Sequence, residues 1–333
     1  MKNIVWVLIV FLFWSCSYSK QDKMNGVSLV ASREQASQTV IDPILKIHAN
    51  YAAVMPFGFI REYESPEILF NTERQWFGER KEGVKQYVEL LHKNGIQVML
   101  KPQLWIWRGE FTGRLQMKTE VQWKQLEDSY ERFILTYAET AEETKVSVFC
   151  IGTELEQFVK QRPDFWKNLI TKVKKVYTGK ITYAANWDEF PRTHFWKDID
   201  YIGIDAYFPL SQEKVPSIVQ LREGWKAHKE KIKNLSEATG KQVIFTEYGY
   251  RSMEYTGKQP WVATRDKAAI SLEGQANATH AIFEAFWEED WFAGGFVWKW
   301  FPDHASSGGS ENDRFTPQNK PAEEVLRSFY SKY

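Results

Sequence analysis

The chain of 333 residues carries 43 basic and 43 acidic side chains, so its formal net charge is zero. A balanced charge offers no electrostatic basis for binding nucleic acid or an anionic membrane surface, and we expect neither kind of binding. Aromatic residues form 16% of the chain and include 15 Trp. Most of them should pack in a core, and a few are expected at a surface where flat rings contact a ligand.

Residues 1–15 have the pattern of an export signal. Lys2 provides the basic start, and residues 4–14 form an apolar run of 11 residues. That run is too short to span a bilayer and fits the hydrophobic part of a signal peptide. We therefore predict that the chain is exported.

Cys16 follows this signal directly, and the polar residues 17–23 come after it. The arrangement resembles the lipid-attachment site of a bacterial lipoprotein, although Phe13 and Trp14 are bulkier than the residues usual there. An ordinary cleaved signal, in which Cys16 is incidental, is the alternative. We expect a lipid on Cys16 to hold the protein at a membrane of a bacterial envelope, in the periplasm or at the cell surface. Residues 17–23 would be a tether and residues 24–333 the folded domain.

From residue 24 onward, short apolar runs rich in β-branched and aromatic residues alternate with segments of helical periodicity. The predicted strands cover residues 24–30, 51–60, 95–105, 146–156, 180–187, 200–210, 242–251 and 291–301. The first predicted helix follows the strand at residues 24–30 and ends near residue 48. The others cover residues 79–94, 120–144, 164–177, 217–238, 266–289 and 322–330, and a short helix holds His194 and Trp196. Strict alternation indicates a parallel sheet with right-handed crossovers, and eight such units close into a (β/α)8 barrel. No linker-like composition interrupts them, so we predict a single domain.

Two of these strands end in Thr-Glu, at Thr153-Glu154 and at Thr246-Glu247. Burial on both faces explains the apolar runs of parallel strands, but it does not explain a carboxylate at the end of the run. Barrel enzymes carry their chemistry at the C-terminal ends of the strands. The fourth and seventh strands lie across the barrel mouth from each other, so Glu154 and Glu247 can converge as the paired carboxylates of a glycosidase. The alternative for Glu154 is a structural ion pair.

Five segments, in the order of the strands, resemble glycoside hydrolase family 113, whose characterised members are β-mannanases. They read IGTEL at residues 151–155, ITYAANW at 181–187, YIGIDAYFP at 201–209, FTEYGYRS at 245–252 and GFVWKW at 295–300. The resemblance implies a retaining enzyme of the barrel clan that has its catalytic glutamates on strands four and seven. In that pattern Glu154 is the acid/base, Glu247 is the nucleophile, and the substrate is β-1,4-mannan or manno-oligosaccharides.

The resemblance also implies contacts to the nucleophile and to the sugar. Tyr207 matches the strand-six tyrosine that hydrogen-bonds the nucleophile, and Trp298 or Trp300 would form the floor under the sugar. The clan usually has Asn before the acid/base, where this chain has Thr153. Asn186 is a candidate for part of that role. Packing in the core is the alternative for each of the aromatic residues.

Other polar and aromatic residues at the predicted strand ends are candidate sugar contacts, namely Lys101, Gln103, Trp105, Trp187 and Asp205. The six His show no metal-binding spacing and no nucleotide-binding glycine motif occurs, so we predict neither a metal nor a cofactor. Cys150 is expected in the core. We expect the protein to be a monomer that binds an oligosaccharide or polysaccharide.

Two alternatives to mannan hydrolysis stay open. The first is the same chemistry on another β-linked glycan, such as a glucan or a peptidoglycan-like polymer, and no residue separates the two substrates. The second is a non-catalytic carbohydrate-binding lipoprotein on the same barrel. The intact pair of glutamates argues against the second, because a binding protein would tolerate the loss of either carboxylate.

Overall fold

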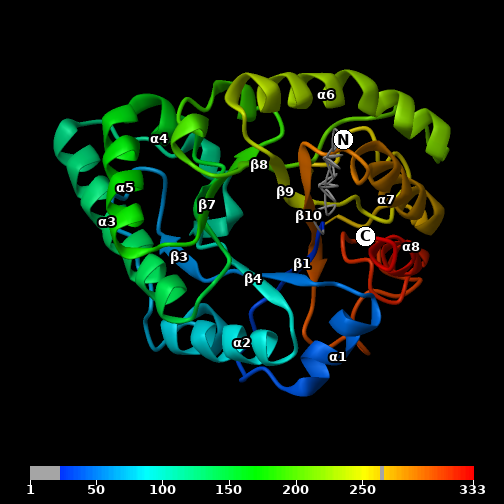
Figure 1. Ribbon diagram of the computed structural model, residues 1–333, viewed down its shortest axis with the longest axis horizontal. Coiled ribbons are helices and arrows are strands. Elements are labelled where there is room, and N and C mark those ends of the chain that lie inside the picture. The colour runs from blue at the N-terminus through cyan, green and yellow to red at the C-terminus, as the bar shows by residue number, and fades with distance from the viewer. Residues whose placement is uncertain (1–22, 263–265) are drawn as a thin grey trace, which may run out of the picture.

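The computed structural model describes residues 23–262 and 266–333, and eight parallel strands close into a barrel (Figure 1). Around the barrel the order is β1–β10–β9–β8–β7–β6–β4–β2, and β1 pairs with β2 to complete the circle. The barrel strands are β1 (Met24–Leu29), β2 (Tyr51–Val54), β4 (Gln97–Leu100), β6 (Val148–Thr153), β7 (Lys180–Asn186), β8 (Ile202–Asp205), β9 (Val243–Tyr248) and β10 (Phe292–Trp300). Two further strands are β3 (Phe57–Ile60) and β5 (Gln103–Ile106). The predicted single-domain (β/α)8 barrel is confirmed.

Helices surround the barrel on its outside (Figure 1). They are α1 (Gln38–Lys46), α2 (Lys81–Lys93), α3 (Glu120–Glu143), α4 (Glu156–Gln161), α5 (Pro163–Val176), α6 (Ile218–Thr239), α7 (Leu272–Phe286) and α8 (Pro321–Tyr330). Short 3-10 helices are η1 (Phe77–Glu79), η2 (Trp107–Gly109), η3 (Thr112–Arg114), η4 (Phe190–Arg192) and η5 (Trp196–Asp198). His194 was predicted in the same short helix as Trp196, but it lies outside η5.

Capping residues set the helix ends. Ser217 and Gln220 form a capping box at the start of α6, and Gly240 ends that helix in the left-handed conformation at a φ of 68°. The helix predicted over residues 266–289 is shorter in the structure. It begins only after Ser271, whose side chain accepts a hydrogen bond from a backbone N–H of the first turn of α7.

Proline interrupts two of the predicted strands. Residues 51–60 divide into β2 and β3, and residues 95–105 contain β4 and the start of β5. Pro56 and Pro102 stand between the halves and lack the N–H that a continuous strand ladder uses. Beyond the prolines, β3 and β5 pair in parallel with each other as a separate two-stranded sheet. The chain thus extends past the barrel at this side of its mouth.

Apolar side chains fill both the layer between strands and helices and part of the barrel interior. The interior cluster contains Met24, Ala53, Met55, Met99, Val148, Tyr201, Ile244, Ala293 and Phe296. A second set of buried side chains from the barrel strands and their ends is polar, namely Ser28, Lys101, Thr182, Asp205 and Thr246. Buried polar groups are normally hydrogen-bonded to one another, and in a barrel their presence at the C-terminal ends of strands marks the usual position of a site.

Lys23 belongs to the folded domain, although it was predicted as the last residue of the tether. It is buried, and its ammonium donates to the carbonyl oxygen of Glu289 at 2.7 Å and to that of Phe292. The predicted export signal and Cys16 lie outside the described residues. Within those residues, no helix combines the length and the apolar character needed to cross a membrane.

Candidate active site

A groove with a volume of about 1660 Å³ opens at the C-terminal ends of the barrel strands. Glu154, Asp205 and Glu247 are among the residues that line it. Aromatic side chains form much of the rest, and most come from β3, β5 and the neighbouring loops: Phe57, Phe59, Trp76, Trp105, Trp107, Phe111, Trp298 and Phe301. Trp107 is 67% exposed. Large exposed rings around a groove are typical of a surface that binds a ligand.

A β-bulge turns Glu247 toward the groove. In β9, Ile244 faces the barrel interior and Phe245 packs in the layer beneath the helices. Regular alternation would then turn Thr246 inward and Glu247 outward. The pairing with β8 shifts register just before Asp205, which pairs with Glu247. A bulge of this kind re-aims the side chain that follows it, so Thr246 and Glu247 both reach the mouth.

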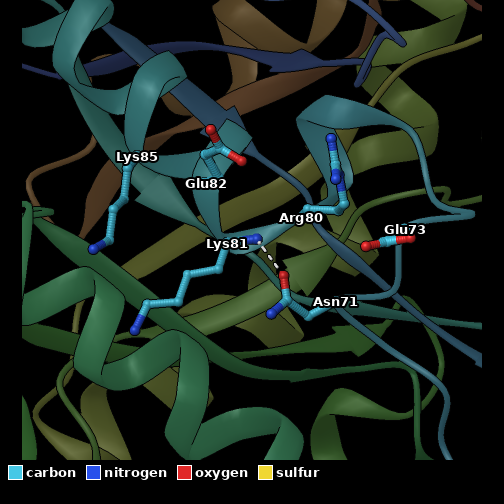
Figure 2. Close-up of a pocket in the computed structure, with 6 residues that line it drawn as sticks. All are labelled: Asn71, Glu73, Arg80, Lys81, Glu82 and Lys85. Atoms are coloured by element: carbon cyan, nitrogen blue, oxygen red, sulfur yellow. Dashed lines mark hydrogen bonds between the residues drawn. The ribbon is translucent and has the colours of Figure 1, made fainter.

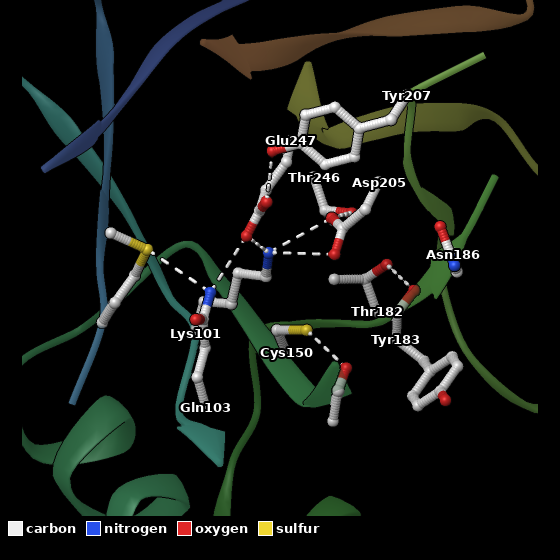
Figure 3. Close-up of polar contacts among 12 residues, drawn as sticks. Lys101, Gln103, Cys150, Thr182, Tyr183, Asn186, Asp205, Tyr207, Thr246 and Glu247 are labelled. Atoms are coloured by element: carbon white, nitrogen blue, oxygen red, sulfur yellow. Dashed lines mark hydrogen bonds and ion pairs between the residues drawn. The ribbon is translucent and has the colours of Figure 1, made fainter. Parts of the chain in front are cut away.

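Three donors hold the Glu247 carboxylate (Figure 3). Lys101 Nζ donates to Glu247 Oε1 at 2.5 Å, and Gln103 Nε2 donates to the same oxygen at 3.0 Å. The hydroxyl of Tyr207 donates to Oε2 at 2.7 Å. All three partners need an acceptor, which is what an ionised carboxylate offers. The arrangement therefore fixes the orientation of the Glu247 carboxylate.

Lys101 lies between two carboxylates (Figure 3). Its Nζ is 3.2 Å from Asp205 Oδ1 and 3.4 Å from Oδ2, and Asp205 Oδ1 also accepts the hydroxyl of Thr246 at 2.7 Å. Burial by itself lowers the pKa of Lys101, but the charges of Asp205 and Glu247 outweigh burial and raise it. Burial and the charge of Glu247 raise the pKa of Asp205 to about 7, against the opposing effect of Lys101. One positive charge is thus shared by two buried acids.

Glu154 directly follows β6 at the edge of the groove. Its backbone is left-handed, with a φ of 51°, a conformation that is unfavourable for a residue with a Cβ atom and that neighbouring contacts must hold in place. Burial raises the pKa of Glu154 well above its usual range, and the charges of Asp205 and Glu247 raise it further. A protonated carboxyl beside an ionised one is the division of roles used by acid/base glycosidases.

A second pocket, of about 420 Å³, lies at the start of α2 and shares Glu73 with the groove (Figure 2). Its lining is polar and carries both signs of charge: Asn71, Glu73, Arg80, Lys81, Glu82 and Lys85. Asn71 Oδ1 accepts the backbone N–H of Lys81 at 2.9 Å and so caps the first turn of α2. Within residues 23–262 and 266–333, no group of three or more His, Cys, Asp or Glu could hold a metal ion.

Comparison of the sequence with known families identifies its family. The model of Glycoside Hydrolase Family 113 matches residues 30–320. The chain belongs to glycoside hydrolase family 113. It is therefore a glycoside hydrolase, and the expected family resemblance is confirmed. A comparison with curated protein sequences found no match.

Solved structures share the fold of this family 113 hydrolase. One is a complex of a family 113 β-1,4-mannanase, with a TM-score of 0.81 and 21% identity, covering 94% of this chain and 100% of that chain. Another is the family 113 β-mannanase AaManA from Alicyclobacillus acidocaldarius in complex with ManMIm, with a TM-score of 0.79 and 23% identity, covering 93% and 98%. A β-glucuronidase from Ruminococcus gnavus has a TM-score of 0.58 and 12% identity, covering 89% of this chain and 46% of that one.

Several of the predicted site residues of this family 113 chain do meet at the groove. Glu154, Glu247, Asp205, Trp105 and Trp298 all line it. Tyr207 is buried behind Glu247, in the position from which it was expected to hydrogen-bond that carboxylate. Gln103 lines the groove and contacts Glu247 as well. Residues far apart in the sequence are thus brought to one place by the ends of different strands.

Trp300 does not face the sugar, and that prediction is wrong. Its side chain is fully buried in the core and packs on His304, with ring centroids 5.6 Å apart. The prediction assumed that Trp298 and Trp300 alternate on one face of a regular strand. In the structure the pairing of β10 with β1 shifts register between Val297 and Trp300, so the two rings point to different regions.

Three other residues that were predicted to contact the sugar have different contacts in the structure. Lys101 is fully buried, and its ammonium is committed to two carboxylates rather than to the open groove. Trp187 stacks on Trp261, with ring centroids 4.9 Å apart, and does not line the groove. Asn186 does not line it either, and its Oδ1 accepts the backbone N–H of Trp187 at 2.8 Å.

The sequence assigned no role to three residues that the structure brings to the site. Trp76 and Phe111 lie outside the predicted strands and helices, and both line the groove. Glu189 is a buried carboxyl behind Glu154, with 2% of its surface exposed. Its position directly after the fifth predicted strand was the available signal, since strand ends were the places where acidic residues were expected to be functional.

Proposed function

We propose that this family 113 enzyme hydrolyses β-1,4-mannosidic bonds in mannan or manno-oligosaccharides and retains the anomeric configuration. The observation that carries the proposal is the pairing, at one groove, of a triply hydrogen-bonded Glu247 with Glu154, whose pKa is raised. The β-mannanases of the same family support mannan as the substrate. The volume of the groove, about 1660 Å³, and its aromatic lining support an oligosaccharide rather than a single sugar.

In the first step, a carboxylate oxygen of Glu247 attacks the anomeric carbon and forms a glycosyl ester. The bond from that carbon to the leaving oxygen breaks, and the proton of Glu154 passes to the leaving oxygen. The aglycone sugar departs as a neutral alcohol. Because Lys101, Gln103 and Tyr207 already hold Glu247 in place, the nucleophile needs little reorganisation before it attacks.

In the second step, the now ionised Glu154 takes a proton from water, and the water oxygen attacks the anomeric carbon. The ester bond breaks, and Glu247 returns to its carboxylate form. Glu154 is again protonated and ready for the next cycle. Each step inverts the configuration once, so the product has the configuration of the substrate.

The product profile on mannopentaose tests this function. We expect shorter manno-oligosaccharides, with the β-anomer appearing first by NMR of the fresh product. A panel that includes β-glucans and peptidoglycan separates mannan from other β-linked glycans. Turnover of another glycan but not of mannopentaose would contradict mannan as the substrate. An α-anomer formed first would contradict retention of configuration. No hydrolysis of any glycan would contradict the proposed activity.

Replacing Trp107 by Ala should weaken the use of long substrates. Covering an apolar ring face with sugar contributes about 1–2 kcal/mol, which corresponds to roughly a 5- to 30-fold fall in kcat/KM on mannopentaose. Hydrolysis of a short aryl β-mannoside should change little, because that substrate need not reach the outer wall. Trp261→Ala is the control, since Trp261 is also an exposed tryptophan, at 40%, but does not line the groove. An equal effect of both substitutions on mannopentaose would contradict the role of Trp107.

We also propose that the enzyme acts from a bacterial envelope, anchored by a lipid on Cys16. The support is the sequence of residues 1–16 alone. Mass spectrometry of the mature N-terminus should find a lipid-modified residue 16, and the Cys16→Ser variant should leave the membrane fraction. Recovery of an unmodified Cys16 inside the mature chain would rule out the anchor.

A further inference from the structure

Glu189 is a buried acid whose burial the proposed reaction does not explain. It lies between β7 and η4, and its partners among the described residues are a hydroxyl and a backbone amide rather than a basic side chain. Tyr183 donates its hydroxyl to Glu189 Oε1 at 2.6 Å, and the backbone N–H of Asn186 donates to Oε2 at 3.0 Å. Burying a carboxyl without a counter-charge is unfavourable. The hydrogen bond between Glu189 and Tyr183 is therefore a candidate for a functional role.

That contact leads directly to Glu154. The Tyr183 hydroxyl, while donating to Glu189, accepts the backbone N–H of Leu155 at 2.7 Å. Leu155 is the residue after Glu154, and the N–H of Glu154 itself donates to the carbonyl oxygen of Ala184 at 2.8 Å. The peptide groups on both sides of the Glu154 Cα atom are therefore held by neighbouring residues of β7.

The ring of Tyr183 is itself fixed by packing. It is fully buried, and it contacts the rings of Trp166, Phe195 and Trp196 at centroid distances of 5.5, 5.4 and 6.1 Å. A rigid hydroxyl can hold a backbone amide in a conformation that the residue would otherwise avoid. The left-handed backbone of Glu154 is such a conformation.

We propose that Tyr183 and Glu189 are positioning residues that hold the acid/base Glu154 in the orientation needed for proton transfer. Glu189 orients the hydroxyl of Tyr183, that hydroxyl fixes the amide of Leu155, and the fixed backbone aims the Glu154 carboxyl into the groove. The inference rests on the proposed acid/base role of Glu154.

Charge adds to this geometry. Burial raises the pKa of Glu189 to about 8, while the bonds from Tyr183 and Asn186 lower it, and Glu156 and Asp205 raise it. Besides burial, the groups that act on the pKa of Glu154 are Asp205, Glu247 and Glu189, which raise it, and Lys101, which lowers it. Glu189 is therefore mostly ionised only above about pH 8, and in that range its charge favours the protonated form of Glu154. Loss of that charge should lower the pH at which Glu154 gives up its proton in the same range.

Two conservative variants test the proposal. Tyr183→Phe keeps the buried ring and removes the hydroxyl, and Glu189→Gln keeps the shape and removes the ionisable carboxyl. On mannopentaose, whose leaving group needs an acid, we expect kcat/KM to fall roughly 10- to 100-fold, the loss typical of a misplaced catalytic group. On a dinitrophenyl β-mannoside, whose leaving group needs no acid, the first step should change less than about threefold. Above about pH 8, where Glu189 is ionised, Glu189→Gln should also move the basic limb of the pH profile to lower pH.

Tyr177→Phe is the matched control. Tyr177 is equally buried, and its hydroxyl donates to the carbonyl oxygen of Val146 at 2.8 Å, at the opposite end of β6 from Glu154. The substitution Tyr177→Phe removes one buried hydrogen bond and leaves the contacts of Glu154 unchanged. If Tyr183→Phe and Glu189→Gln affect both substrates alike and leave the pH profile in place, as a purely structural role requires, the positioning role is overturned.

Glu154→Ala separates this inference from the function on which it rests. Glu154→Ala should lose more activity on mannopentaose than on the dinitrophenyl β-mannoside. If it does so but Tyr183→Phe and Glu189→Gln do not, only the positioning role fails. If Glu154→Ala hydrolyses mannopentaose like the wild type, the acid/base assignment fails, and the positioning role fails with it. If the wild type prefers another β-glycan, the same comparison uses its oligomer and its aryl glycoside. A crystal structure of Tyr183→Phe should show the Glu154 backbone displaced from its left-handed conformation, and an unchanged backbone contradicts the proposal.

Discussion

Glu247→Ala should reduce kcat on mannopentaose by roughly 10⁴-fold or more, the scale of loss seen when a covalent nucleophile is removed. Glu247 is held in the groove by hydrogen bonds from three different side chains, those of Lys101, Gln103 and Tyr207. Added azide or formate should restore part of the activity on an activated aryl mannoside, because a small anion fits the space left by the side chain. The rescued azide product should have the inverted configuration, since only one displacement then takes place.

The fold should survive this substitution. Lys101 keeps Asp205 as its counter-charge, so no buried charge is left unpaired. Glu156→Ala is the matched control, because Glu156 lies two positions from Glu154 but pairs with Arg192 instead of lining the groove. That control should retain most of the activity. Hydrolysis of mannopentaose by Glu247→Ala at the wild-type rate would end the proposed mechanism.

Lys101→Met should be strongly destabilising. It removes the cation that pairs with both Asp205 and Glu247 and leaves these two acids together in a site with almost no solvent. Removing one partner of a buried ion pair typically costs about 3–5 kcal/mol of the free energy of unfolding. Activity should fall by about 10²-fold as well, because one of the two acids takes up a proton and Glu247 loses its shortest contact. Urea unfolding and kcat/KM on mannopentaose measure the two effects.

The destabilisation of Lys101→Met should depend on pH. The folded pKa of Asp205 is raised from 3.8 to about 7 even with Lys101 present, and Lys101 opposes that rise. Without Lys101 the folded pKa goes higher still, so the folded state binds a proton that the unfolded chain has released. The free energy of unfolding of the variant should therefore fall as pH rises from about 4 to above 7. Lys124→Met, which removes an exposed lysine paired with Asp128, is the control. A Lys101→Met variant as stable as this control at pH 8 would contradict the argument.

The sequence alone predicted the barrel, because its pattern is local and repeated. Apolar runs bounded by helical segments set the order of strands and helices, and closure of eight parallel units follows from that alternation. The position of Glu154 and Glu247 at the mouth followed from the same logic, since both come at the end of such a run. The catalytic roles that we propose for them came from the family resemblance. Even the break in the second and third strands had a visible signal in Pro56 and Pro102.

Other features of the site depend on contacts between strands that no local pattern records. The register shift that turns both Thr246 and Glu247 to the mouth, and the one that separates Trp298 from Trp300, belong to pairs of strands rather than to either strand alone. Lys101 lies between two acids only because β4, β8 and β9 bring Lys101, Asp205 and Glu247 together. Alternation along one chain predicts which face a side chain would take in a regular strand. Pairing with a neighbour determines whether the strand is regular, and here that pairing placed Glu247 at the groove.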